Sequence, residues 1–217
     1  MHMRVLTVAA AIVMGGIPAV AAAQTSSADP IRLGILGGVN SATVGGKDAE
    51  DADRLTAFLF GVSVLKPLGG GWGIRPELLY SRRGAEAPID DEDVTGKAKI
   101  KIDYLDVPVL VQYEGKTGGG VRPHVYAGPS VGFKVRCKLE GTGAGVTASM
   151  DCDDADLDIK SVDFAGVVGG GVALPIGNHF ATLGVRYQHG FTDLESESVV
   201  KNRVLSVYAG LEFSLTR

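Results

Sequence analysis

The chain has 217 residues, a formal net charge of −4 and 31 glycines, which is about twice the ordinary share of glycine. This length suits one undivided all-β domain. The slight negative charge and the lack of a basic tract in the sequence argue against nucleic acid as a partner. The glycines are spread through alternating apolar runs, which is typical of barrel strands and not of a flexible linker.

The first residues have the pattern of an export signal. A short positive segment at 1–4 precedes a mostly apolar run at 5–20, and Ala21–Ala23 supplies the small residues that a signal peptidase needs. A transmembrane anchor is the weaker alternative, because glycine and proline interrupt the run and it falls short of a membrane span. We therefore expect a signal peptide at 1–23, a short flexible lead-in at 24–30 and a barrel domain at 31–217.

Strict two-residue alternation marks the strands of the expected barrel, because successive strand side chains point to opposite faces. It is clearest where Leu105, Val107 and Val109 alternate with Asp106 and Pro108. The same pattern predicts eight strands, at residues 31–39, 56–66, 72–83, 98–113, 121–135, 162–174, 180–189 and 201–215.

The connections between these strands alternate in length. Long polar segments lie at 40–55, 84–97, 136–161 and 190–200, and short turns lie between them at 67–71, 114–120 and 175–178. Brief turns on one side and longer loops on the other are typical of outer-membrane barrels. The sequence therefore predicts an all-β fold, an eight-stranded antiparallel up-and-down transmembrane β-barrel, with both termini on the periplasmic side.

One strand departs from simple alternation. Ile100, Ile102 and Tyr104 occupy one parity, whereas the apolar residues from Leu105 onward occupy the other. Two explanations remain open: a β-bulge near Tyr104, or first residues that stand beyond the apolar zone.

Parity alone does not say which face of the barrel is apolar. A soluble lipocalin-like barrel turns its large apolar side chains inward, and a membrane barrel turns them outward. The polar faces mix small residues with charges of both signs, which suits a narrow interior. The apolar faces carry the aromatic residues that interfacial girdles require, namely Phe58, Phe60, Phe133, Phe164 and Phe213, with Trp72, Tyr80, Tyr113 and Tyr187 towards strand ends. These features favour the membrane barrel, and a soluble exported barrel that binds a small apolar ligand is the alternative.

Charged residues on the polar faces form the expected polar network of the interior. Eight strands enclose a space that side chains can fill, and unpaired buried charges are costly, so we expect ion pairs and no pore. The network residues are Arg75, Glu77, Asp106, Arg122, His124, Arg186 and Glu212.

Cys137 and Cys152 lie in one polar segment. In an exported protein such a pair favours a disulfide over a metal or catalytic pair. Closing a loop of this size contributes on the order of 3 kcal/mol in the chain-entropy model.

Two further clusters suggest chemistry, and each has a simpler explanation. The alternating aspartates at 151, 153, 154, 156 and 158 offer oxygen ligands for calcium, but they lack the glycine and closing glutamate of an EF-hand loop. A solvated acidic loop is therefore the favoured explanation of these aspartates, and also of the acidic run at 90–93. His124 and Ser130 share a face, but no third orienting group can be named. We therefore expect no catalytic site, metal or cofactor, and not an enzyme.

Several segments resemble the PorT-type outer-membrane β-barrel family. They are Tyr104–Tyr113, Arg122–Phe133, Asp163–Val172, Arg186–Phe191 and Asn202–Leu211, and the resemblance spans about residues 31–215. It implies an eight-stranded barrel in the outer membrane of a double-membraned bacterium, in contact with outer-membrane lipid and, during insertion, with the assembly machinery. It implies no single activity and names no extracellular or envelope partner. A structural or interaction role through the long external loops is therefore the expectation.

The last strand resembles the assembly signal of outer-membrane proteins. It carries apolar residues at Val207, Ala209, Leu211 and Phe213. It departs from that signal because residues 214–217 follow the final aromatic.

Overall fold

The computed structural model describes residues 29–45, 53–91, 94–143, 146–155, 159–192 and 201–215. The expected signal peptide and most of the lead-in lie outside these residues. No helix among the described residues has the length and apolar character needed to cross a membrane.

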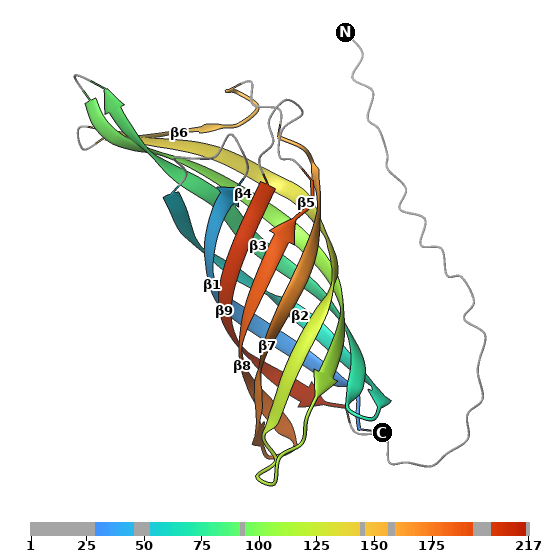
Figure 1. Cartoon of the computed structure of the whole chain (residues 1–217). Helices are drawn as coiled ribbons and strands as arrows, with labels where there is room; N and C mark the ends of the chain where they lie inside the picture. The colour runs from blue at the N-terminus through green and yellow to red at the C-terminus, as the bar shows by residue number, and fades with distance from the viewer. Residues whose placement is uncertain are drawn as a thin grey trace.

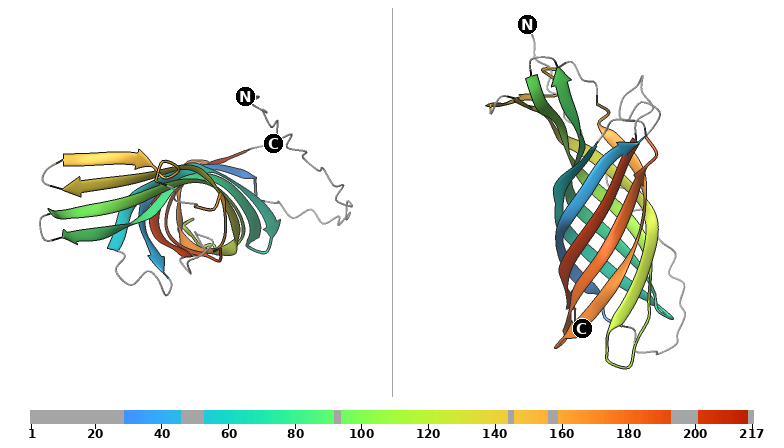
Figure 2. Two further views of the ribbon diagram at one scale, coloured as in Figure 1. Left: turned by 90° about the horizontal axis from the view of Figure 1, so that it is seen from above. Right: turned by 60° about the vertical axis from the view of Figure 1, so that its left-hand side comes forward.

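The regular elements of the described chain are strands, arranged around a closed barrel (Figures 1 and 2). Their bounds are β1 (Arg32–Gly45), β2 (Asp53–Gly69), β3 (Trp72–Asp91), β4 (Val94–Glu114), β5 (Arg122–Gly143), β6 (Val146–Asp151), β7 (Val162–Ile176), β8 (His179–Gly190) and β9 (Lys201–Ser214). Successive strands pair antiparallel, except that β7 pairs with β5 and not with β6; β1 pairs with β9, and β6 pairs only with β5. The eight strands other than β6 therefore close the ring, which confirms the predicted fold class.

The two ends of the barrel differ. One end holds the turns at Gly70–Gly71 and Gly177–Asn178, and both ends of the described chain meet there, where the Leu215 amide donates to the Ile31 carbonyl. We call this the lower end. The opposite, upper end carries the longer connections.

A four-stranded sheet projects beyond the upper end, where the sequence had suggested loops (Figure 1). It consists of 82–91 of β3, 94–103 of β4, 136–143 of β5 and β6, and we call it the extension sheet. The prediction of loops over 84–97 and 136–161 was therefore wrong in large part. The physical reason is visible in the sequence, because Lys97, Lys99 and Lys101 alternate with apolar residues at strand period.

The base of the extension sheet has its own small core. Ile102, Tyr104, Cys137, Cys152 and Ile159 are buried together there, with Ile100 and Leu139 packed against them. The predicted disulfide between Cys137 and Cys152 is present and joins β5 to the turn after β6. Apolar residues before Tyr104 therefore continue the inner face of β4, in a core that lies above the barrel interior.

The predicted irregularity near Tyr104 is also present. Asp103 pairs with Arg136, whereas Tyr104 pairs with Lys134, so Val135 has no partner on β4. The extra residue of this β-bulge lies on β5, and β4 keeps its own alternation. The bulge turns the β5 side chains from Arg136 onward to new faces.

Burial in the barrel wall alternates as the membrane interpretation requires. The inner positions are buried and largely polar, and the outer positions carry exposed apolar side chains. Glycines allow tyrosines to lie along the inner wall, because a Cβ on Gly169 or Gly184 would approach the Tyr126 or Tyr208 hydroxyl to 2.5 Å. This close approach accounts for part of the high glycine content.

Replacing both cysteines with serine should loosen the extension sheet and leave the barrel intact. The disulfide closes a loop between residues 15 apart, so its loss should cost about 3 kcal/mol of local stability. Limited proteolysis followed by mass spectrometry should show faster cleavage at 136–155, with unchanged heat-modifiable gel mobility. Loss of that mobility would contradict a role confined to the extension sheet.

Candidate functional site

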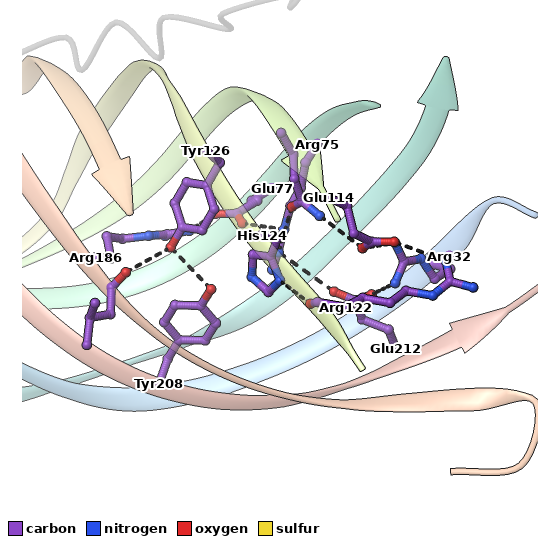
Figure 3. Close-up of polar contacts among 12 residues, drawn as sticks. Arg32, Arg75, Glu77, Glu114, Arg122, His124, Tyr126, Arg186, Tyr208 and Glu212 are labelled. Carbon is purple, nitrogen blue, oxygen red and sulfur yellow. Dashed lines mark hydrogen bonds and ion pairs between the residues drawn. The ribbon is translucent and has the colours of Figure 1, made fainter. Parts of the chain in front are cut away.

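Charged side chains from both sides of the barrel meet inside its lower half (Figure 3). We call this set the lower ion-pair cluster. It consists of Arg32 on β1, Arg75 and Glu77 on β3, Glu114 on β4, Arg122 on β5, Arg186 on β8 and Glu212 on β9. Alternation explains the location, because each residue occupies an inward position of its strand.

Glu77 lies towards the inner end of the cluster and is bound by two arginines. Its Oε1 is 2.9 Å from Arg75 Nε, and its Oε2 accepts from Arg186 Nη2 at 2.5 Å. The Glu77 side chain is fully buried, as are nearly all of the two guanidinium groups. Removing such charges from water is expensive, and only close pairing compensates for it.

The chain of ion pairs continues to the lower mouth. Arg75 Nη1 lies 3.7 Å from Glu212 Oε1, and Arg32 Nη1 lies 2.8 Å from Glu212 Oε2. Arg32 also pairs with Glu114, which in turn accepts from Arg122 Nη1 at 3.0 Å. Contiguous contacts therefore run from Arg186 to Arg122 and join strands that are not neighbours in the wall.

Aromatic rings complete the surroundings of these arginines. Arg75 and Arg186 lie 5.7 and 5.5 Å from the centre of the Tyr126 ring. Arg32 and Arg122 both lie over Phe180, at 4.9 and 4.5 Å. Such contacts favour the cation in a site with little water.

Above the lower cluster, apolar side chains occupy the inner face. Leu36, Leu59, Leu79, Leu110, Tyr126, Val167 and Tyr208 form one buried group. The Tyr126 hydroxyl donates to the Tyr208 hydroxyl at 3.2 Å, so β5 and β9 meet across the interior. Leu79 separates Glu77 from Arg83 along β3, which places this layer between two sets of charges.

A second, smaller set of charges lies above that layer, and we call it the upper ion-pair cluster. Arg83 pairs with Asp106, and its Nη1 donates to Asp163 Oδ2 at 2.8 Å. Asn202 Nδ2 donates to the same oxygen at 3.0 Å. Arg83 also lies 4.5 Å from the centre of the Tyr104 ring, so this cluster touches the core of the extension sheet.

The expected network residues all lie on inward positions, but they do not form a single group. Arg75, Glu77, Arg122, Arg186 and Glu212 belong to the lower cluster, whereas Asp106 belongs to the upper one. His124 is buried between Arg122 and Tyr126, with its Nδ1 3.4 Å from the Arg122 carbonyl oxygen and its ring stacked near Tyr126.

Sequence analysis missed four partners, namely Arg32, Arg83, Glu114 and Asp163. Their parity gave a usable signal, because each shares the inward face with polar or small neighbours. Glu114 falls within the turn expected at 114–120, but it is the last residue of β4 and is buried.

The structure does not assemble the other candidate sites. His124 and Ser130 share the inner face of β5 but lie roughly 20 Å apart along the strand, at about 3.3 Å per residue. Within the described ranges, no three His, Cys, Asp or Glu side chains are placed to hold a metal ion. Asp151, Asp153 and Asp154 are exposed, and Asp156 and Asp158 lie outside the described residues.

Comparison with known proteins gives a family and several structural likenesses. The family model for the outer membrane protein beta-barrel domain matches residues 22–196. Neisserial surface protein A is similar at 14% identity and a TM-score of 0.49, over 88% of this chain and 100% of that chain. Ail of Yersinia pestis, in complex with the heparin analogue sucrose octasulfate, is similar at 16% identity and a TM-score of 0.42, over 85% and 99% of the two chains.

The N-terminal β-barrel domain of Pseudomonas aeruginosa OprF is similar at 16% identity and a TM-score of 0.36, over 84% of this chain and 97% of that chain. No curated protein sequence matches the chain significantly.

Removing the fully buried Glu77 carboxylate should show how much the lower cluster contributes to stability. Glu77→Gln leaves Arg75 and Arg186 without their shared counter-charge, so we expect a loss of about 3–5 kcal/mol in the free energy of unfolding. Urea titration in lipid vesicles measures it. The matched control is Glu86→Gln, which breaks a pair with Lys99 on the extension sheet and should cost about 0–1 kcal/mol. Equal losses in the two variants would contradict the account.

Proposed function

The chain belongs to the outer membrane protein beta-barrel domain family, and from that premise we propose that it is a closed, non-conducting barrel of the cell outer membrane. In this proposal side chains fill the lumen, and the upper end makes whatever contacts the protein makes with other molecules. The main support for the proposal is the arrangement of the buried charges. Burying these charges costs free energy that only close pairing offsets, and the closely paired side chains leave little room for water.

Contact with membrane lipid is supported by the outer face of the wall. Large apolar side chains are exposed on every strand of the barrel, among them Phe60 at 53%, Val125 at 61% and Val207 at 60%. A soluble protein does not expose apolar surface on this scale, and a bilayer would cover it. The lipocalin-like alternative needs the opposite polarity, with apolar residues inside and charges outside, so these positions disfavour it.

A filled lumen is supported by three stacked layers of inner side chains. The lower and upper ion-pair clusters enclose the buried leucines and tyrosines between them. Eight strands leave only enough space for side chains, and here arginines and tyrosines reach across it. A continuous water path would have to break several of these contacts at once.

Three narrower parts of the proposal concern the PorT-type family, recognition by the assembly machinery and the orientation in the membrane. The segments that resemble the PorT-type family support membership of that group, without a particular activity. The outward apolar residues of β9, with Val207 at 60% and Leu211 at 42% exposure, suit recognition by the assembly machinery. The short lower turns and the longer upper connections support an orientation with the lower end in the periplasm.

A structural or interaction role is favoured over catalysis. His124 and Ser130, which share the inner face of β5, are both buried and lie far apart along the strand. A catalytic pair needs hydrogen-bond reach and access to substrate. The exposed extension sheet is the part of the described chain best placed to meet an extracellular partner.

Planar-bilayer recordings test the closed lumen directly. The purified barrel should show no stepwise conductance, because the ion pairs and the Tyr126–Tyr208 contact block the interior. Tyr126→Ala combined with Tyr208→Ala should introduce small conductance steps by removing the rings that meet across it. Val125→Ala, on the outer face of the same strand, is the control and should stay silent. Discrete conductance in the unmodified protein would contradict the proposal.

A further inference from the structure

Basic side chains from three strands gather on the outer side of the extension sheet, next to the barrel. Two neighbouring cross-strand rows contain them. Arg82 on β3 pairs with Asp103 on β4, which pairs with Arg136 on β5. In the next row, Lys101 on β4 pairs with Lys138 on β5. These basic residues are far apart in the sequence, so this surface does not appear there as a basic tract.

The side chains of these rows lie on the side of the sheet that continues the apolar outer face of the barrel, not on the side that continues its interior. Along β4 the outward positions run from Tyr113 through Val109 to Leu105, and the same parity then gives Asp103 and Lys101. Alternation therefore directs Lys101 to the side that bears the exposed apolar belt. On β5, Phe133 belongs to that belt at 45% exposure.

The height of the rows matches the edge of a membrane. From Tyr113 to Leu105 the strand rises roughly 27 Å at about 3.3 Å per residue, or roughly 20 Å along the barrel axis with the usual tilt of about 40°. The apolar band of such barrels is about 25 Å tall. The row of Asp103 therefore lies at the level of lipid headgroups, and the row of Lys101 just beyond it.

Two carboxylates at this edge, those of Asp103 and Glu140, already bind basic side chains. Asp103 is bound by Arg82, with Nε to Oδ1 at 2.6 Å and Nη2 to Oδ2 at 2.9 Å, and it accepts from the Tyr80 hydroxyl at 2.6 Å. Glu140 is bound by Lys101 at 2.5 Å. Arg82 in turn lies 5.1 Å from the Phe58 ring centre, at the top of the aromatic belt.

In the part of the chain that the structure describes, two cations form no ion pair, although the exposed Asp151 on β6 lies opposite Lys138. Among the described residues, no carboxylate lies within 4 Å of the Arg136 guanidinium or the Lys138 ammonium group. Arg136 is exposed, and its neighbour Val135, the bulged residue, is 54% exposed. A cationic pair beside an exposed apolar side chain suits an amphiphile that carries both a negative headgroup and acyl chains.

We propose that Arg136 and Lys138 bind phosphate groups of lipid in the outer leaflet of the outer membrane. The guanidinium of Arg136 can hold two phosphate oxygens at once, and Lys138 supplies a second positive charge beside it. Val135 and Phe133 contact the acyl chains of the same lipid. This inference rests on the proposed function, because it requires an inserted barrel with its extension sheet outside.

Lipid retention by charge variants tests the site. The protein is reconstituted in phosphatidylcholine vesicles that contain lipid A, a phosphorylated glycolipid, and the lipid A that stays bound on repurification is measured by mass spectrometry. Each cation near a membrane surface is expected to change association about fivefold. Arg136→Gln and Lys138→Gln should therefore each retain about fivefold less lipid A. The control Lys66→Gln, an exposed outward lysine on β2 near the lower end, should behave as the unmodified protein.

A parallel arm identifies the chemistry that is recognised. Lipid A from which the phosphates have been removed keeps the acyl chains, so the unmodified protein should retain it no better than the variants retain intact lipid A. Equal retention by all proteins, or equal retention of the two lipids, would overturn the proposal. So would binding of a soluble sulfated polysaccharide that depends on Arg136 and Lys138 while lipid retention does not.

The heat-modifiable gel mobility of each reconstituted protein distinguishes failure of the phosphate site from failure of the proposed function. An inserted barrel with unchanged lipid retention would refute only the phosphate site. A protein that fails to insert would refute the proposed function together with this inference.

Discussion

Every feature of this barrel depends on the strict alternation of side chains along antiparallel strands. Closure leaves no free edge in the wall, so the backbone polar groups are satisfied within it. Alternation then divides the side chains into two sets that differ in polarity. Within the apolar band the charged side chains point inward, where water is scarce, and each charge must therefore find a partner.

The buried ion pairs meet that requirement, and they also connect strands of the barrel to one another. Glu77 is the clearest case, because it binds an arginine of its own strand and one from β8. Arg32 likewise connects Glu114 and Glu212. Such contacts tie together strands that do not pair in the wall, and the tyrosines beside them occupy space that glycine leaves open. We propose that the interior holds the wall together and does not pass or bind molecules.

The sequence was sufficient for the eight barrel strands, because a period of two marks them. The small and charged residues of the polar faces and the aromatic residues of the apolar faces then indicated which side is outward. It was insufficient for the partners of the charges, because strand register decides which rows meet. Arg186 and Glu77 lie 109 residues apart, and nothing local links them. The extension sheet was missed for another reason. Charged residues such as Lys99 suggested a loop, although the alternation with Ile100 continues through them.

If the outer apolar face lies in lipid as proposed, the single tryptophan of the chain can report on it. Trp72 is 52% exposed on the outer face near the lower end, beside Tyr113. In vesicles of brominated phosphatidylcholine its fluorescence should be quenched, most strongly when the bromines lie near the headgroup. A tryptophan that bromolipids leave unquenched, and that aqueous acrylamide quenches freely, would contradict the account.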